Sequence, residues 1–452
     1  MKSIVVVVAL MLATGLPSAV DSPNQTLDAG PDPAIAASYF AEARALADRD
    51  GGRLWGVRID GPMLFVDPAT RRAVANQADI EGRLSASHGV FIGQIDADVA
   101  VANTAVTWAG VHWTMILWPL PADPGRRAEL MAHEMFHRVQ TTLGIPMANP
   151  ANVHLDSLDG RHLLQLEWRA LRAALDSTGQ RRRTAVADAL AFRNYRRGLF
   201  ATAAVEENGL EGNEGLAEYT GCAIANTGTA DRRVAAIRRL EAAHSRPSLT
   251  RSFAYASGPA YGVLLDEMVP EWRKQFAEVR DLGAILGRSI QSRQKLPTRA
   301  AIDRRARPYG GAELLASEHE RESTRQKRMS ADRARFVDGA VLKLPLSSPN
   351  VSFDPNTLAP LEPFGTVYAT ARVSDAWGTL DVKGGALLAS DWSSVTVALA
   401  RGRDLATLAG PSLTGDGWRL ELAPGWTIVP AGKPGLFVAV NHGPATSIPP
   451  SL

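Results

Sequence analysis

This sequence of 452 residues contains little cysteine and little lysine, and its net charge is small. The single cysteine, Cys222, excludes an internal disulfide and any zinc module built from cysteine pairs. The 49 basic residues comprise 42 Arg and only 7 Lys, and 47 acidic residues nearly balance them, so the net charge of +2 does not indicate a nucleic-acid partner. The remaining composition, 45% hydrophobic and 21% charged, is typical of a soluble globular protein with several domains.

Two arginine clusters are the remaining candidates for binding nucleic acid. They lie at residues 181–183 and 196–197, inside stretches with helical periodicity. Clusters of this kind are typical of solvated helix faces, and we predict that role for both. We therefore expect no nucleic-acid partner.

The first twenty residues predict a secretory signal peptide. Lys2 supplies a positive start, residues 4–13 form an unbroken apolar run, and residues 18–20 are small enough for cleavage. About ten apolar residues are too few to cross a bilayer, which needs about 20, so an uncleaved membrane anchor is disfavoured. We expect an exported protein, periplasmic or secreted, with no stable membrane insertion after signal cleavage.

Changes in composition divide the rest of the chain into predicted regions. Residues 21–33 are rich in Pro, Asp and Ser and predict a flexible leader, whereas residues 34–122 predict an α/β sheet subdomain. Residues 123–335 have helical periodicity, and residues 336–452 carry short β-prone runs separated by Gly, Pro and Ser, as in a β-sandwich. The predicted fold class is α+β: a mixed or antiparallel sheet with a helical subdomain, followed by an all-β, sandwich-like domain.

Two strand predictions within the first subdomain bear on the site. Residues 54–59 and 63–66 are β-prone and flank Asp60-Gly61-Pro62, which predicts a hairpin. Residues 105–117 are rich in β-branched and aromatic side chains. This second run predicts a strand, and packing of its aromatic residues in the core is one interpretation of it.

A five-residue motif, His133-Glu134-Met135-Phe136-His137, carries the most specific chemical signal. Positions i and i+4 of a helix share one face, so both imidazoles can bind one metal ion, while Glu134 can take a proton from bound water. Asp123-Pro124 predicts a helix start and Gly144 a helix end, which places the motif in mid-helix. With 9 His and 20 Glu in the chain, the pattern is expected by chance roughly 0.01 times. The alternative is a pair of ordinary core or surface histidines.

A catalytic zinc takes three protein ligands and keeps one position for water, so one further ligand is needed. The candidate carboxylates are Glu167, Glu206, Glu207, Glu211, Glu214 and Glu218. Glu214 and Glu218 fall one turn apart on a predicted helix that Asn208 and Glu211 start as a capping pair. The neighbouring residues are small, and a carboxylate on a closely packed face is costly to bury unless it binds a partner.

We therefore predict Glu214 as the third ligand and Glu218 as the acceptor for the free N–H of a ligand histidine. Glu167, on a strongly helical stretch, is the rival ligand. An exposed acidic helix face is the remaining alternative.

The motif at residues 133–137, followed by Asn213-Glu214-Gly215-Leu216-Ala217, resembles the gluzincin metallopeptidases, both thermolysin-like and aminopeptidase-like. The resemblance covers roughly residues 101–270 and implies a zincin-like catalytic domain with one Zn²⁺ per chain, held by His133, His137 and Glu214. Seventy-six residues separate the motif from Glu214, which is more than those two families typically have. No G-x-M-E-N segment precedes the helix, so recognition of a free amino terminus is not implied.

The segment Tyr255-Ala256-Ser257-Gly258 resembles the Y-x-x-G of the aminopeptidase-like group, which implies that Tyr255 stabilises the oxyanion. Tyr261 is the alternative donor, and ordinary packing is the alternative role. By the same resemblance, residues 113–118 are expected to form the edge strand that holds an extended substrate. His112, His154 and His162 are further residues that could assist the transition state.

The sequence thus predicts an exported zinc metallopeptidase with a peptide or protein substrate and Glu134 as general base. The alternatives are a non-catalytic, metal-bearing binding or assembly factor of the cell envelope, and a zinc hydrolase that acts on a non-peptide or cell-wall amide. Endo- or exopeptidase specificity and the oligomeric state are not predicted.

Overall fold

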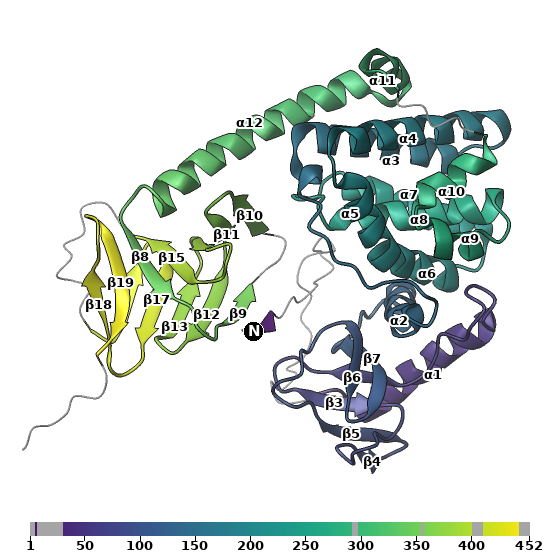
Figure 1. Cartoon of the computed structure of the whole chain (residues 1–452). Coiled ribbons are helices and arrows are strands. Elements are labelled where there is room, and N and C mark those ends of the chain that lie inside the picture. Colours follow the sequence, from purple (N-terminus) through teal and green to yellow (C-terminus); the bar gives the residue numbers. More distant parts are fainter. Residues whose placement is uncertain (1–4, 7–29, 292–296, 354–356, 400–409, 443–452) are drawn as a thin grey trace, which may run out of the picture. The chain divides into compact units, whose positions relative to one another are not determined.

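The computed structural model describes residues 5–6, 30–291, 297–353, 357–399 and 410–442 (Figure 1). The protein has mixed α/β structure, with several sheets and many helices, in agreement with the coarse fold class predicted from the sequence. Most of the predicted signal peptide and leader lies outside the described residues. Within them, no helix is both long enough and apolar enough to cross a membrane.

The chain divides into two compact units. The first, here called the helical unit, ends at Glu322, and the second, the β unit, begins at Ser323 and includes the two-residue strand β1 (Val5–Val6). The division falls inside helix α12 (Gly311–Phe336), which runs unbroken up to the predicted boundary at residue 336.

The helical unit begins with helix α1 (Pro33–Asp50) and a six-stranded mixed sheet in the order β4-β5-β3-β2-β7-β6. The strands are β2 (Met63–Val66), β3 (Arg72–Ala75), β4 (Ser85–Ser87), β5 (Val90–Gln94), β6 (Thr104–Trp108) and β7 (Val111–Leu117). Strands β2 and β7 run parallel, and the other neighbouring strands are antiparallel.

The predicted edge strand at residues 113–118 is not at the edge. Strand β7 is paired on both sides, with β2 and with β6, so β6 is the edge strand. Ala109 and Gly110 have φ of 48° and 76°, and two left-handed residues form the tight hairpin turn that folds β6 back onto β7. Trp113 is fully buried, so the alternative interpretation of this run, packing in the core, is the one the structure shows.

The predicted hairpin of residues 54–59 with β2 is also wrong. Residues 54–59 contain no strand; instead the Trp55 indole donates to the Thr220 hydroxyl at 2.9 Å and packs against Phe136 and Trp272. Trp55 therefore packs against the helical core, whereas Ile59 is buried in the cluster between the sheet and helices α1 and α2. Strand β2 finds its antiparallel partner in β3.

One face of the sheet carries the helix of the metal motif. Alternate residues of β2, such as Met63 and Phe65, pack with residues of α1 and of α2 (Pro124–Gln140), among them Met131 and Met135. Leu64 and the other residues of alternate parity face the opposite side, against a separate cluster. The period-two pattern of a strand thus fixes α2 against a rigid, two-sided sheet.

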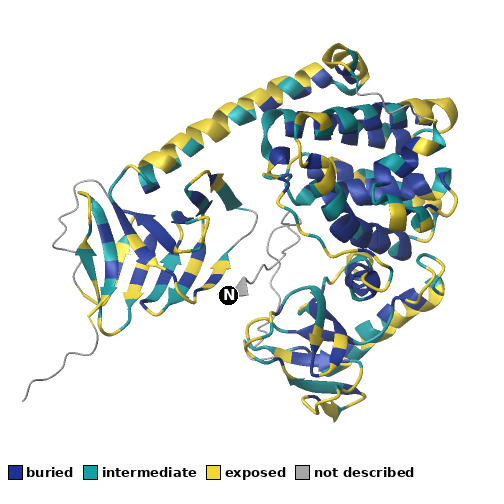
Figure 2. Ribbon diagram, in the orientation of Figure 1, coloured by how far each residue is buried: buried dark blue, intermediate teal, exposed yellow. Residues whose placement is uncertain are grey.

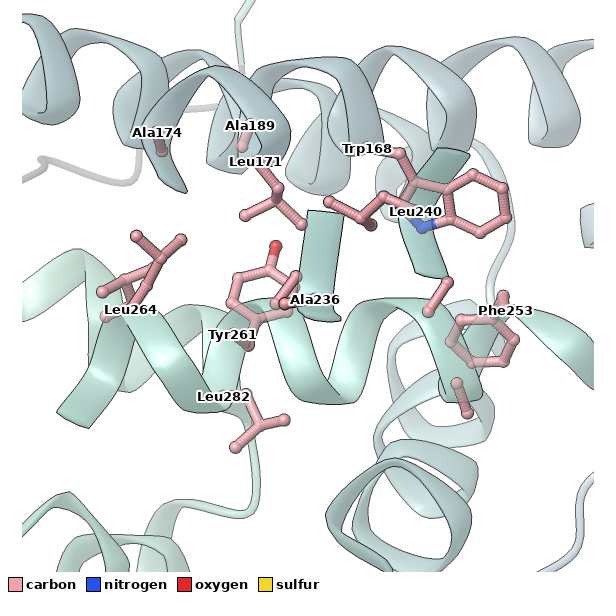
Figure 3. Close-up of a cluster of buried hydrophobic side chains, with 14 of the residues drawn as sticks. Trp168, Leu171, Ala174, Ala189, Ala236, Leu240, Phe253, Tyr261, Leu264 and Leu282 are labelled. Atoms are coloured by element: carbon pink, nitrogen blue, oxygen red, sulfur yellow. The ribbon is translucent and has the colours of Figure 1, made fainter. Parts of the chain in front are cut away.

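The rest of the helical unit consists of helices packed around one large core (Figure 3). The helices are η1 (Val153–Asp156), α3 (Leu158–Leu175), α4 (Gly179–Leu199), α5 (Ala203–Leu210), η2 (Glu211–Gly215), α6 (Leu216–Ala225), α7 (Thr229–Ala243), α8 (Ser252–Met268), α9 (Trp272–Val279), α10 (Leu282–Ser289), α11 (Arg299–Ala306) and η3 (Arg307–Tyr309). Figure 3 shows Leu171 of α3 facing Tyr261 of α8, and Trp168 of α3 on the side of Phe253 of α8.

The β unit contains two sheets. One has the order β1-β9-β12-β13-β17-β16 and the other β10-β11-β14-β15-β8-β19-β18. The strands are β8 (Val341–Pro345), β9 (Asn350–Phe353), β10 (Leu358–Leu361), β11 (Gly365–Tyr368), β12 (Ala371–Asp375), β13 (Gly378–Val382), β14 (Ala386–Leu388), β15 (Ser394–Ala398), β16 (Ser412–Gly415), β17 (Trp418–Leu422), β18 (Trp426–Pro430) and β19 (Leu436–Asn441). Residues of both sheets, such as Leu342 and Leu380, share one apolar core. Buried and exposed positions alternate along several of these strands (Figure 2).

Candidate metal centre

The two motif histidines lie on α2, as the sequence predicts. The Asp123 side chain accepts a hydrogen bond from the backbone N–H of Arg126 and caps the helix, and Pro124 occupies its first turn. His133 and His137 are therefore one turn apart, and both are buried. Their Nε2 atoms face each other at 3.2 Å.

Glu214 completes a group of three possible metal ligands. Its Oε2 atom lies 3.6 Å from Nε2 of His133 and 3.7 Å from Nε2 of His137, and one ligand atom from each residue lies within 4.8 Å of the others. Glu214 lies on η2, a π-helical turn between α5 and α6. Such insertions are frequent at functional sites because they change the direction in which a helix presents its side chains.

Glycines allow α6 and η2 to approach their neighbours closely enough to form this group. A Cβ atom on Gly221 would lie 2.7 Å from the backbone oxygen of Glu129 on α2, and one on Gly258 of α8 would lie 2.2 Å from the backbone oxygen of Gly215. Neither distance can accommodate a side chain without backbone movement. The small residues noted in the sequence therefore bring α2, α6 and α8 together around Glu214.

In their neutral forms with the proton on Nδ1, both histidines would direct an Nε2 lone pair at the space beside Glu214. Nδ1 of His133 lies 3.0 Å from Oε2 of Glu218, and Nδ1 of His137 lies 2.8 Å from Oε1 of Gln140, so each Nδ1–H has an acceptor. Two lone pairs that face each other at 3.2 Å repel unless a cation lies between them. The donor set of two imidazoles and one carboxylate fits a divalent metal ion.

The electrostatics of the site favour positive charge at this position. Burial opposes protonation of His133, but hydrogen bonds to Glu214 and Glu218 outweigh it and raise the pKa of His133 to about 10. Burial raises the pKa of Glu218, whereas the charge of Arg239 and the hydrogen bond from His133 lower that pKa to about 2. A metal ion would therefore replace the proton that His133 otherwise carries beside the carboxylates of Glu214 and Glu218.

Glu134 has the environment expected of a general base. Its side chain is buried, and its Oε2 atom has no hydrogen-bond partner among the described residues. Burial raises the pKa of Glu134 above its usual value, against the opposing charges of His133 and His137. A buried carboxylate oxygen without a partner is costly, and a bound water or substrate would supply the missing donor.

Tyr255 and Arg251 both bind the ligand carboxylate. The Tyr255 hydroxyl donates to Oε2 of Glu214 at 2.6 Å, and Arg251 donates from Nη2 to Oε1 of Glu214 at 2.8 Å. The Tyr255 ring also stacks on the His133 imidazole, with ring centres 5.9 Å apart. Tyr255 therefore lies at the site, whereas Tyr261, the alternative donor, donates to Glu167 in the helical core.

Glu167, the rival third ligand, belongs to a separate buried ion cluster. Its carboxylate lies 2.6 Å from Nη1 of Arg196 and 3.2 Å from Nη1 of Arg193, both on α4. Glu207 and Glu211 bind the same arginines. All of these side chains are almost fully buried, so the prediction of a solvated helix face at residues 196–197 is wrong.

The same ion cluster overturns the predicted cap at Asn208. Helix α5 begins at Ala203 and continues through this position into η2, so Asn208 does not start a helix. Its side-chain oxygen accepts hydrogen bonds from Arg193 and Arg197. Arginines of α4 thus bind the side chains of both Asn208 and Glu211, the expected capping pair.

The other candidate side chains lie outside the group. Glu206 is 3.7 Å from the His154 ring, and His154 binds Glu207 of the ion cluster. His162 faces the Gly311 carbonyl, and His112 is exposed on β7 beside Thr107. None of them contacts a member of the His133–His137–Glu214 group in the described residues.

Gln140, Arg251 and Arg239 contact the site and were not predicted. Gln140 follows His137 by three residues on α2, and Arg251, the residue directly before α8, precedes Tyr255 by four, so helical spacing could have found both. Arg239 of α7 donates to Glu218 at 2.7 Å, and no local pattern in the sequence connects them.

Comparison of the chain with models of protein families, with curated proteins and with solved structures gives no match. The interpretation of this site therefore depends on its own geometry and chemistry.

Proposed function

We propose that this chain is an exported zinc-dependent metallopeptidase. The observation that carries the proposal is the convergence of two imidazole Nε2 atoms and one Glu214 oxygen, beside the buried Glu134 carboxylate that has an unpartnered oxygen. A structural zinc is normally closed by a fourth protein ligand, and this group offers three. Three ligands with a neighbouring base are what hydrolysis needs.

In this proposal His133, His137 and Glu214 hold Zn²⁺, which supplies a Lewis acid and a bound water of lowered pKa. Two imidazoles and one carboxylate favour zinc over the harder cations Mg²⁺ and Ca²⁺. Glu218 and Gln140 orient the two rings through their Nδ1–H groups. The motif helix α2 packs on a mixed sheet, and η2 faces it from a helical subdomain, which supports a zincin-like catalytic domain of the gluzincin type.

The residues of this chain then have distinct roles. Glu134 takes the proton of the attacking water and transfers it to the leaving amine, a contribution of about 10²–10⁴ in rate. Tyr255 and Arg251 hold Glu214 in place through their hydrogen bonds to its carboxylate, and in this proposal the Tyr255 hydroxyl also stabilises the negative charge that develops on the substrate. Among the described residues no strand pairs with the outer edge of β6, so in this proposal an extended peptide pairs there.

The test compares purified wild type with Glu134→Gln and Glu214→Ala by metal analysis and by turnover of a peptide library. We expect Glu134→Gln to keep zinc and to lose turnover by about 10²–10⁴. Glu214→Ala should lose zinc. Arg372→Ala serves as the control because this side chain is exposed and lies in the β unit. A variant in the ion cluster, such as Arg196→Lys, would not serve as a control because the cluster is buried in the helical unit.

Each result has a defined meaning. If Glu214→Ala retained zinc at the wild-type level, the ligand assignment would be wrong. If wild type bound zinc but cleaved no peptide, and Glu134→Gln behaved identically, a metal-bearing binding factor or a hydrolase of another amide would replace the peptidase. Export is tested by the N-terminal sequence of the mature protein, which should begin near residue 20 or 21.

A further inference from the structure

Gln140 connects two of the candidate metal ligands. Its side chain is fully buried, and all of its polar atoms have partners. Oε1 lies 2.8 Å from Nδ1 of His137, while Nε2 lies 3.1 Å from the Pro146 carbonyl and 3.0 Å from Oδ1 of Asn213. Asn213 in turn directs its Nδ2 at Oε1 of Glu214, at 3.4 Å.

The Pro146 carbonyl fixes the direction of every hydrogen bond in this chain of contacts. A carbonyl only accepts, so the Gln140 atom beside it must be the amide nitrogen. The amide oxygen of Gln140 must then face His137, and an oxygen without a hydrogen can only accept. Nδ1 of His137 must therefore carry the proton, which leaves the Nε2 lone pair directed at Glu214 and His133.

The same reasoning extends to the other ligand. Because Nε2 of Gln140 donates to Asn213, the Asn213 oxygen faces Gln140 and its nitrogen faces Glu214. Glu214 is thus connected to His137 through two amides and no metal. The two residues lie 77 positions apart in the sequence, on different helices.

We propose that Gln140 is a positioning residue that sets the tautomer of His137 and, through Asn213, aligns Glu214 with it before metal binds. The inference rests on the proposed metal centre and adds that its two histidines are oriented by different kinds of acceptor. The carboxylate of Glu218 orients His133, whereas a neutral amide orients His137. The hydrogen-bond chain from Pro146 fixes His137 without adding charge to the site.

The chain offers a matched control for this proposal. Gln165 is also buried, and its Oε1 accepts from Nδ1 of His244 at 3.0 Å, while its Nε2 donates to Glu318. Gln165→Met removes the same type of contact from the same unit, away from the metal centre. Gln140→Met has nearly the same volume as wild type but can neither accept from His137 nor donate to Asn213.

The experiment has two readouts on the full-length protein. The first is zinc affinity, measured by competition with a chromophoric chelator. Loss of a contact of this kind typically lowers metal affinity by about 10–100-fold, and we expect that loss for Gln140→Met and less than a threefold change for Gln165→Met. The second is ¹⁵N NMR of histidine-labelled, metal-free protein, which reports which ring nitrogen of His137 carries the proton.

In metal-free wild type we expect the His137 proton on Nδ1, and in Gln140→Met a mixture of tautomers. Gln140→Glu keeps an acceptor for His137 and should keep the proton on Nδ1, which makes it the conservative variant if Gln140→Met does not fold. Zinc affinity within threefold of wild type and an unchanged tautomer in Gln140→Met would overturn the proposal, as would a proton on Nε2 in wild type. Failure of wild type to bind zinc would instead reject the proposed function, since the tautomer is measured without metal.

Discussion

The two units of this protein bury different kinds of side chains. In the helical unit, arginine, glutamate and histidine side chains lie in the interior, and Arg196 and Glu167 are fully buried. In the described part of the β unit, the buried polar side chains are those of Ser394 and Thr396, and the core is otherwise apolar. Burying a charge costs several kcal/mol unless partners compensate it. The stability of the helical unit therefore depends on its buried ion pairs, whereas that of the β unit depends on apolar packing.

The possible metal ligands lie in the unit that buries charge. The ion cluster of Arg193, Arg196, Glu207 and Glu211 lies on α4, α5 and η2, and Glu211 precedes Glu214 by three residues on η2. The cluster therefore fixes the turn that carries Glu214, the proposed third ligand. The β unit has an ordinary two-sheet core and, among its described residues, no comparable group.

The largest effect that sharpens this comparison is expected from Arg196→Met. It leaves the buried carboxylates of Glu167 and Glu207 each without one partner, and breaking a buried pair in this way costs about 3–5 kcal/mol. Hydrogen exchange followed by mass spectrometry should show faster exchange across α3 to α6. Equal acceleration in β12, β13 and β17 would contradict the independence of the two units.

A second effect should come from zinc itself. At a free zinc concentration of 100 times its dissociation constant, a site present only in the folded state gains about 2.7 kcal/mol. Thermal unfolding followed by unit-specific hydrogen exchange should show that gain in the helical unit alone. Glu214→Ala should remove it, and stabilisation of the β unit by zinc would contradict the assignment of the site.

A third effect concerns acid. Burial raises the pKa of Asp281, but Arg193 and Arg197 outweigh it and lower that pKa to about 2; Arg196 and Arg197 likewise hold the pKa of Glu207 well below its usual value, against burial. These carboxyls bind protons more readily when unfolded, so their stabilisation is complete above about pH 5 and is lost as the pH falls towards 2.

For Asp281 alone this stabilisation amounts to about 2 kcal/mol. The free energy of unfolding, measured with urea at pH 6 and at pH 3, should therefore fall more for the helical unit than for the β unit. The Asp281→Asn variant should reduce the pH dependence. A helical unit equally stable at both pH values would mean that the arginines do not lower the pKa values of these carboxyls below those of the unfolded chain.

The smallest effect is expected from an exposed pair in the β unit. Arg372 and Asp381 lie 2.9 Å apart on β12 and β13, but both side chains are largely exposed. Such pairs contribute about 0–1 kcal/mol because water and salt screen them. Arg372→Ala should therefore unfold within that range of wild type in urea; a loss approaching that of Arg196→Met would remove the contrast between the two units.

Local chemistry predicted the parts of the site that lie within one helix. The positions of His133 and His137 follow from 3.6 residues per turn, and the cap at Asp123 places them in mid-helix. Glu218 also contacts His133 as predicted, because it follows Glu214 by one turn. Helical spacing places each pair of residues on one face, whereas the contact between Glu218 and His133 also needs α6 to pack against α2.

The errors have the opposite origin. Residues 196–197 were assigned to a solvated face because charged clusters usually are exposed, but Arg196 meets Glu167 and Glu207 only after α3, α4 and α5 pack. The prediction of an edge strand at residues 113–118 failed because β2 pairs with β7 in parallel. Nothing within residues 113–118 specifies that partner.

The sequence by itself determined which groups can bind a metal, since residue type sets the donor atom and helical spacing sets which donors share a face. Only the tertiary structure decided which carboxylate joins the histidines. Glu167 and Glu214 are both buried glutamates on helices, but close backbone contact of Gly221 with α2 and of Gly215 with α8 places Glu214 beside the histidines, while the arginines of α4 neutralise Glu167. That choice depends on the distances between helices, which no local pattern in the chain encodes.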